Sequence, residues 1–61
     1  MPRTGHYSKS NGTMSVTIDY INGKARINVY GVVNGKARKM VECLQGSDQE
    51  PGFIMGQFFN E

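Results

Sequence analysis

Cysteine and histidine are almost absent from this chain, which has one of each, Cys43 and His6, in 61 residues. A single cysteine cannot form an intramolecular disulfide. A metal site needs several Cys, His or carboxylate ligands at short spacing, and no such cluster occurs. Small domains usually rely on a disulfide, a metal or a partner subunit. We therefore expect no metal and no cofactor, and stability from a compact core or from self-association.

Long hydrophobic runs are also missing, so the sequence predicts no membrane-spanning segment. The first twelve residues are polar and lack the apolar stretch of a secretory signal. A lone cysteine without such a signal is typical of proteins in the reducing cytosol. We expect a cytoplasmic protein in which residues 1–12 form a flexible N-terminal tail and residues 13–61 form one small domain.

The groups that catalysis needs do not occur together. A nucleophile requires an adjacent base that is itself held in place, whereas Cys43 falls on an apolar face and His6 lies in the predicted tail. The eight glycines are scattered at turns and form no phosphate-binding loop. We therefore expect no enzymatic activity and no small-molecule substrate.

The clearest local signal is a β-hairpin centred on Asn22 and Gly23. Asn-Gly is the preferred pair for a two-residue type I′ turn, in which both residues have positive φ. Pairing outward from this turn places Val16, Ile18, Tyr20, Ala25, Ile27 and Val29 on one face and Ser15, Thr17, Asp19, Arg26, Asn28 and Tyr30 on the other. Both strands alternate in this register, and a one-residue slip would oppose apolar to polar residues. The hairpin is predicted to span residues 14–33.

The five residues 22–26 recur as residues 34–38, which raises a choice between a second hairpin and a helix. A hairpin turn at Asn34 and Gly35 would place three charged residues on the apolar face, namely Lys36, Arg38 and Glu42. A helix instead aligns Ala37, Met40, Val41 and Leu44 at the i, i+3, i+4, i+7 spacing of one helical face. This spacing favours a helix over residues 35–45, with Asn34 as N-cap.

Two further segments remain open to more than one interpretation. Asn11-Gly12 could close an earlier hairpin that pairs Tyr7 with Val16, but Lys9 would then face the apolar side, so we do not favour it. The apolar residues 53–59 fit a third strand or a short helix equally well. The predicted fold is thus a small α+β domain: an antiparallel hairpin, one α-helix (ββα) and a short C-terminal apolar segment.

Charge is segregated along the chain, and this bears on partners rather than on fold. Residues 22–39 hold five cations and no acid, whereas residues 42–61 hold four acids and no cation. Cations contact phosphates and an aromatic ring stacks on bases. The favoured function is therefore nucleic-acid binding by a non-enzymatic regulatory module. The candidate residues are Lys24, Arg26, Asn28, Tyr30, Lys36, Arg38 and Lys39.

The alternative function is protein binding, as an inhibitor or adaptor of the kind found in phages and plasmids. A domain of this size cannot easily bury the whole C-terminal apolar segment, and surplus apolar surface usually marks an interface. The candidate residues for such an interface are Phe53, Ile54, Phe58 and Phe59. A homodimer would use the same surplus apolar surface. A third class of function is that of a structural subunit in a larger assembly.

Overall fold

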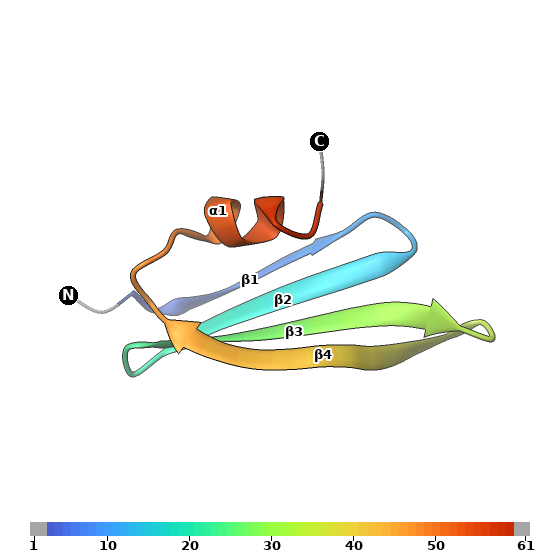
Figure 1. The fold of residues 1–61 in the computed structure, drawn as a ribbon, viewed down its shortest axis with the longest axis horizontal. Helices are drawn as coiled ribbons and strands as arrows, with labels where there is room; N and C mark the ends of the chain where they lie inside the picture. Colours follow the sequence, from blue (N-terminus) through green and yellow to red (C-terminus); the bar gives the residue numbers. More distant parts are fainter. Residues whose placement is uncertain (1–2, 60–61) are drawn as a thin grey trace.

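The computed structural model of the protein describes residues 3–59. Four antiparallel strands follow one another in the order β1-β2-β3-β4, and one short helix, α1, lies over one face of the sheet (Figure 1). The elements are β1 Gly5–Ser10, β2 Met14–Ile21, β3 Lys24–Val33, β4 Lys36–Gly46 and α1 Pro51–Gly56. The fold thus contains both kinds of secondary structure, as predicted, but is mostly β.

The β2–β3 hairpin has the predicted turn and the predicted register. Asn22 and Gly23 have φ values of 51° and 76°, as a type I′ turn requires. The strands pair from Ile21 with Lys24 through Val16 with Val29 without a shift. This register gathers the alternating apolar residues on one face, where they are buried. The hairpin prediction is confirmed.

Residues 36–46 form strand β4 rather than the helix predicted for residues 35–45. Asn34 and Gly35, with φ values of 53° and 76°, close a second turn of the same kind. The first four pairs, from Val33 with Lys36 to Tyr30 with Lys39, continue that turn directly. The helix prediction is therefore wrong, and the repeated Asn-Gly motif does mark a second hairpin.

Two features explain why the predicted pairing argued against this hairpin: Lys36 and Arg38 do lie on the covered side but are exposed there, and a β-bulge at Met40 moves Glu42 off that side. The ladder shifts between Val29 and Tyr30, so Val29 pairs with Val41 and Met40 is the extra residue. The shift moves Glu42 opposite Asn28 and leaves Cys43 opposite Ile27. An unbroken register would have placed the Glu42 carboxylate on the apolar side of the sheet, opposite Ile27. The bulge instead turns it to the other face of the sheet.

The first strand, β1, occupies residues that the sequence analysis assigned to a flexible tail. It pairs with β2 across a longer turn, so Tyr7 lies opposite Ile18 and Lys9 opposite Val16. The Asn11 side chain organises this turn, because its Oδ1 accepts hydrogen bonds from the backbone N–H groups of Thr13 (3.1 Å) and Met14 (2.9 Å). The first Asn-Gly pair therefore does close a hairpin, but with a register two residues away from the tight turn considered above.

The core lies between one face of the sheet and the C-terminal segment. Side chains from β2 and β3 pack against Ile54, Met55 and Phe59. The helix begins with Pro51 at its first turn, a position where proline's missing N–H costs nothing. Tyr20 closes one end of this core: its hydroxyl donates a 2.8 Å hydrogen bond to the carbonyl of Gln49. The C-terminal segment is thus a short helix that closes the core.

The molecule is flat, with extents of 41 × 23 × 15 Å. The helix lies over one face of the sheet, and we call that face the covered face. The opposite face, the open face, displays the other alternating residues of β2, β3 and β4. Nothing within residues 3–59 forms a helix of the length and apolar character that crossing a membrane requires.

Candidate functional site: the open face of the sheet

The open face carries polar, charged and aromatic side chains in rows across the strands. The register sets Asp19, Arg26 and Leu44 in one row, then Thr17, Asn28 and Glu42, and then Ser15, Tyr30 and Lys39. Along β3 this places Lys24, Arg26, Asn28 and Tyr30 on the same side, because side chains two residues apart share a face. The fold thus brings together four of the predicted nucleic-acid-binding residues, with Lys39 beside them.

One acidic side chain, that of Glu42, lies between two of these cations, which the linear charge pattern did not predict. Glu42 reaches both neighbours: its Oε2 lies 4.0 Å from Arg26 Nε and its Oε1 lies 3.5 Å from Lys39 Nζ. All three side chains are about half exposed, so these ion pairs contribute little stability. They do orient the two cations along the middle of the open face.

Asn28 is the one polar residue of the described chain that is buried, with 7% of its surface exposed. Its side-chain Oδ1 is shielded and accepts no hydrogen bond from residues 3–59. An unpaired buried acceptor costs about 1–3 kcal/mol. The centre of the open face therefore holds an acceptor that folding leaves unsatisfied, between Arg26 and Tyr30 on the same strand.

Two predicted binding residues lie elsewhere. Lys36 and Arg38 pair with Val33 and Gly31, near the β3–β4 turn and on the covered side of the sheet. They are exposed there, beyond the part that the helix covers. The structure therefore separates them from the row of cations on β3.

His6 joins the open face through strand β1, a placement that the sequence analysis missed. It lies opposite Asp19, and its Nδ1 contacts the Asp19 carboxylate. The next residue in that row is Arg26. The sequence offered no clear signal for this strand, because Tyr7 is its one apolar residue and all six of its residues are exposed.

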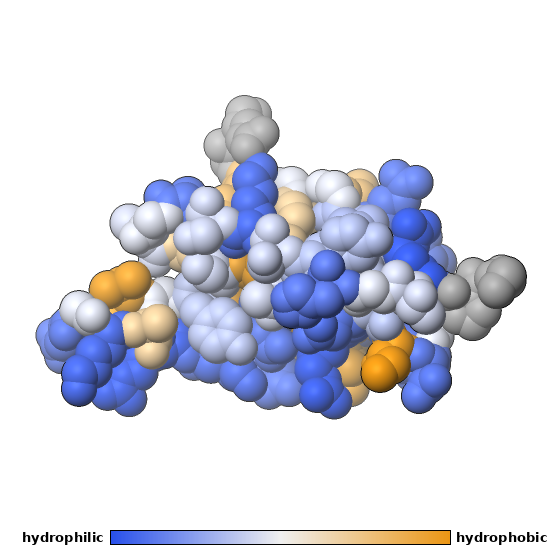
Figure 2. Space-filling view, turned by 180° about the vertical axis from the view of Figure 1, so that it is seen from behind, coloured by the Kyte–Doolittle hydropathy of each residue, from blue (hydrophilic) through white to orange (hydrophobic). Residues whose placement is uncertain are grey.

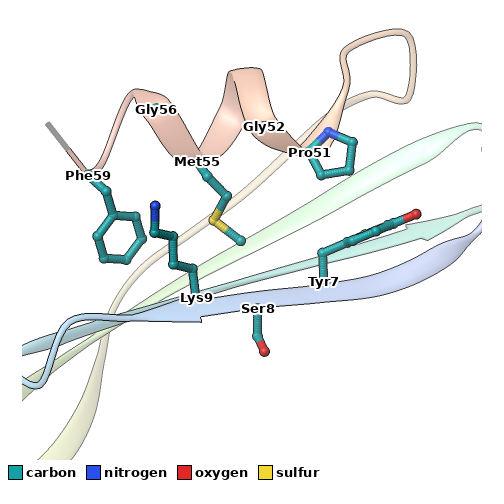
Figure 3. A pocket seen from close by; sticks show the side chains of 8 residues that line it. All are labelled: Tyr7, Ser8, Lys9, Pro51, Gly52, Met55, Gly56 and Phe59. Carbon is teal, nitrogen blue, oxygen red and sulfur yellow. The ribbon is translucent and has the colours of Figure 1, made fainter. Parts of the chain in front are cut away.

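A groove of about 570 Å³ runs between β1 and the C-terminal segment on the covered side. Tyr7 and Lys9 point into it, Met55 and Phe59 face them, and Ser8 points to the opposite side of the sheet (Figure 3). Lys9 Nζ lies 5.2 Å from the centre of the Phe59 ring. This cation–π contact explains how a lysine is tolerated opposite Val16 on the covered face.

The C-terminal residues proposed for a protein interface mostly face the core. Ile54 and Phe59 are buried, and Phe58 packs partly against the core. Only Phe53, with 59% of its surface exposed, points to solvent. The view in Figure 2 is mainly hydrophilic, with small separate hydrophobic areas rather than one broad patch.

The sequence matches no protein-family model, and comparison with curated proteins and with solved structures found no significant similarity. No three His, Cys, Asp or Glu side chains of residues 3–59 meet in an arrangement that could hold a metal ion.

Proposed function

We propose that this protein binds single-stranded nucleic acid on the open face of its sheet, without catalysis. The observation that supports the proposal most strongly is the row Arg26, Asn28 and Tyr30 on β3. It places a cation and an aromatic ring on either side of a polar amide residue, on a sheet surface that the helix does not cover. Exposed sheet faces of this kind hold unstacked bases on aromatic rings.

Each member of the row has a separate role in the proposal. Arg26, with Lys24 and Lys39 at the two ends, contacts the phosphates. Tyr30 stacks on a base, a contact that every base can make. Asn28 lies between these two contacts and keeps this stretch of the surface polar, because its shielded Oδ1 cannot reach a base. Single strands fit better than duplexes because only unpaired bases can reach a flat sheet.

The test is fluorescence anisotropy with short labelled single strands at increasing salt. The double variant K24Q/R26Q removes two charges from the open face, and K36Q/R38Q removes two charges from the covered side. We expect the first to weaken binding and to flatten the salt dependence by about 0.7 per lost phosphate contact. The matched control should bind almost as the wild type does. Equal losses in both would show attraction by net charge only, and absent salt-sensitive binding would refute the proposal.

Tyr30→Leu tests the stacking contact separately from the charges. Leucine keeps an apolar side chain but offers no ring, so we expect affinity to fall about tenfold, within the usual range for one base–aromatic stack. The slope against salt should not change, because no phosphate contact is lost. A changed slope with unchanged affinity at low salt would contradict the role assigned to Tyr30.

The structure favours this function over protein binding through the C-terminal segment. Of the four residues considered for that interface, only Phe53 is exposed, whereas Lys24 and Arg26 are exposed on the open face. Nucleic-acid binding is therefore the function we put forward.

A further inference from the structure

Strand β4 is an edge of the sheet, and it is the longest strand, with 11 residues. Its outer side has no strand partner within residues 3–59. Ten of its eleven residues are exposed, and the exceptional one, Cys43, is half-buried. Met40, Val41 and Leu44 expose 60%, 49% and 62% of their surfaces. An uncovered edge with apolar side chains is a template for pairing with another strand.

The bulge determines which β4 side chains share a face. On the β4 segment before the bulge, Ala37 and Lys39 lie on the open face, and after it Glu42 and Leu44 do. The covered side holds Lys36 and Arg38 before the bulge, and Val41, Cys43 and Gln45 after it. Met40 also lies on the covered side, because its Cγ sits 3.3 Å from the place where a Cβ on Gly31 would be. The assignment of every residue from Lys36 to Gln45 to a face follows from these contacts.

We propose that β4 pairs with β4 of a second copy of this chain, antiparallel, around a two-fold axis between residues 40 and 41. The axis is perpendicular to the sheet, so both open faces lie on the same side. The pairs formed, each made twice, are Lys36 with Gln45, Ala37 with Leu44, Arg38 with Cys43, Lys39 with Glu42, and Met40 with Val41. In every pair the two side chains share a face.

Charge complementarity is the main reason for a second copy as the occupant. The cations of β4 all precede the bulge, and its acid, Glu42, follows it. An antiparallel two-fold pairing therefore sets each basic half against the half without cations. Lys39 then lies directly opposite Glu42 of the other copy, a favourable cross-strand pair. Cations on an edge normally discourage strand pairing, but here they select one partner and one register.

The apolar residues support the same register. Met40 and Val41 of both copies meet around the axis, and Ala37 meets Leu44 on the open face. These contacts cover Met40, Val41 and Leu44, the exposed large apolar residues of β4. The dimer would have a continuous eight-stranded sheet with one open face. The inference does not depend on nucleic-acid binding and is tested in its absence.

The experiment is sedimentation velocity with K39E, E42K and their equimolar mixture. Each single variant faces two like-charged pairs in its own dimer, so its dissociation constant should rise about tenfold or more. In the mixed dimer, the carboxylate introduced by K39E in one chain meets the ammonium introduced by E42K in the other. The second pair is the native one, Lys39 with Glu42. The mixture should therefore dimerise with about the affinity of the wild type. It cannot repair the Lys39–Glu42 contact within each chain, so only pairing between chains explains recovery.

Circular dichroism of each variant checks the fold, which should persist because both side chains are about half exposed. Hydrogen exchange gives a second measure: amides of β4 should be protected in the wild type and in the mixture, but not in either variant alone. A wild type that stays monomeric at high concentration, single variants that dimerise normally, or a mixture that stays monomeric would each overturn the proposal.

Discussion

At the scale of single residues, the two Asn-Gly turns show how little sequence is needed to place a hairpin. Asn22 and Asn34 have φ values of 51° and 53°, and the glycine after each has 76°. Both positions require the left-handed region, which asparagine tolerates and glycine enters freely. The same two residues, each time followed by Lys-Ala-Arg, form the same turn twice, whereas Asn11 and Gly12 lie in a longer turn.

Gly23→Ala should lower the free energy of unfolding by about 1 kcal/mol, because alanine is strained at positive φ. No atom lies within 4 Å of the added Cβ, so the loss measures backbone strain alone. Gly52→Ala in α1 is the matched control: it also has open space but no positive φ. It should be neutral or stabilise by up to about 1 kcal/mol. Urea unfolding followed by circular dichroism measures both, and equal losses would contradict the assigned turn geometry.

Ionisation of Tyr20 should lower the free energy of unfolding in alkali. Burial raises the pKa of its phenol above the usual 10.0, against the opposing charge of Arg3. The Tyr20 phenol therefore loses its proton at a lower pH in the unfolded chain than in the folded protein. Its contribution to stability is fully present below pH 10 and is lost as the pH rises above that value. Tyr20→Phe should cost about 1 kcal/mol at neutral pH, since the Gln49 carbonyl loses its donor. The difference in unfolding free energy between Tyr20→Phe and the wild type should shrink in alkali. A deficit that widens with pH in thermal melts would contradict this origin.

At the scale of the element, β4 shows how a bulged strand can imitate a helix in sequence. Ala37, Met40, Val41 and Leu44 have helical spacing, yet two of them lie on each face of the strand. The extra residue offsets the alternation by one, which turns a period of two into spacings of three and four. Local periodicity alone cannot distinguish these cases. The second Asn-Gly turn was the better signal.

Helix α1 is too short to be stable alone, so its packing on the sheet must hold it in place. Ile54→Ala should therefore lower the free energy of unfolding by about 3 kcal/mol, because Ile54 is fully buried. Phe53→Ala, one residue earlier and 59% exposed, should change it by less than about 0.5 kcal/mol. Chemical denaturation of both variants measures the difference. Similar losses in the two would mean that α1 does not close the core as described.

At the scale of the whole molecule, the sheet and the C-terminal segment provide a thin core, with nine buried apolar residues among residues 3–59. A chain of this length buries a smaller share of its surface than larger domains do. Two sheet edges and one sheet face remain uncovered within residues 3–59. The two proposals assign a partner to the open face and to the β4 edge.

The melting temperature should rise with protein concentration if two copies pair through β4, because association stabilises the folded state by mass action. K39E should melt at a temperature that hardly changes with concentration. Differential scanning calorimetry over a wide concentration range makes this comparison without nucleic acid. A wild-type melting temperature independent of concentration would argue against the dimer.

The sequence by itself determined the β2–β3 hairpin, its register and its two faces, because a type I′ turn and strict alternation are local properties. It also indicated the polar row on β3. The bulge at Met40, the place of Glu42 among the cations and the pairing of His6 with Asp19 were decided only by tertiary structure. Each depends on which residue of a distant strand lies opposite, and a one-residue shift there reverses every face that follows.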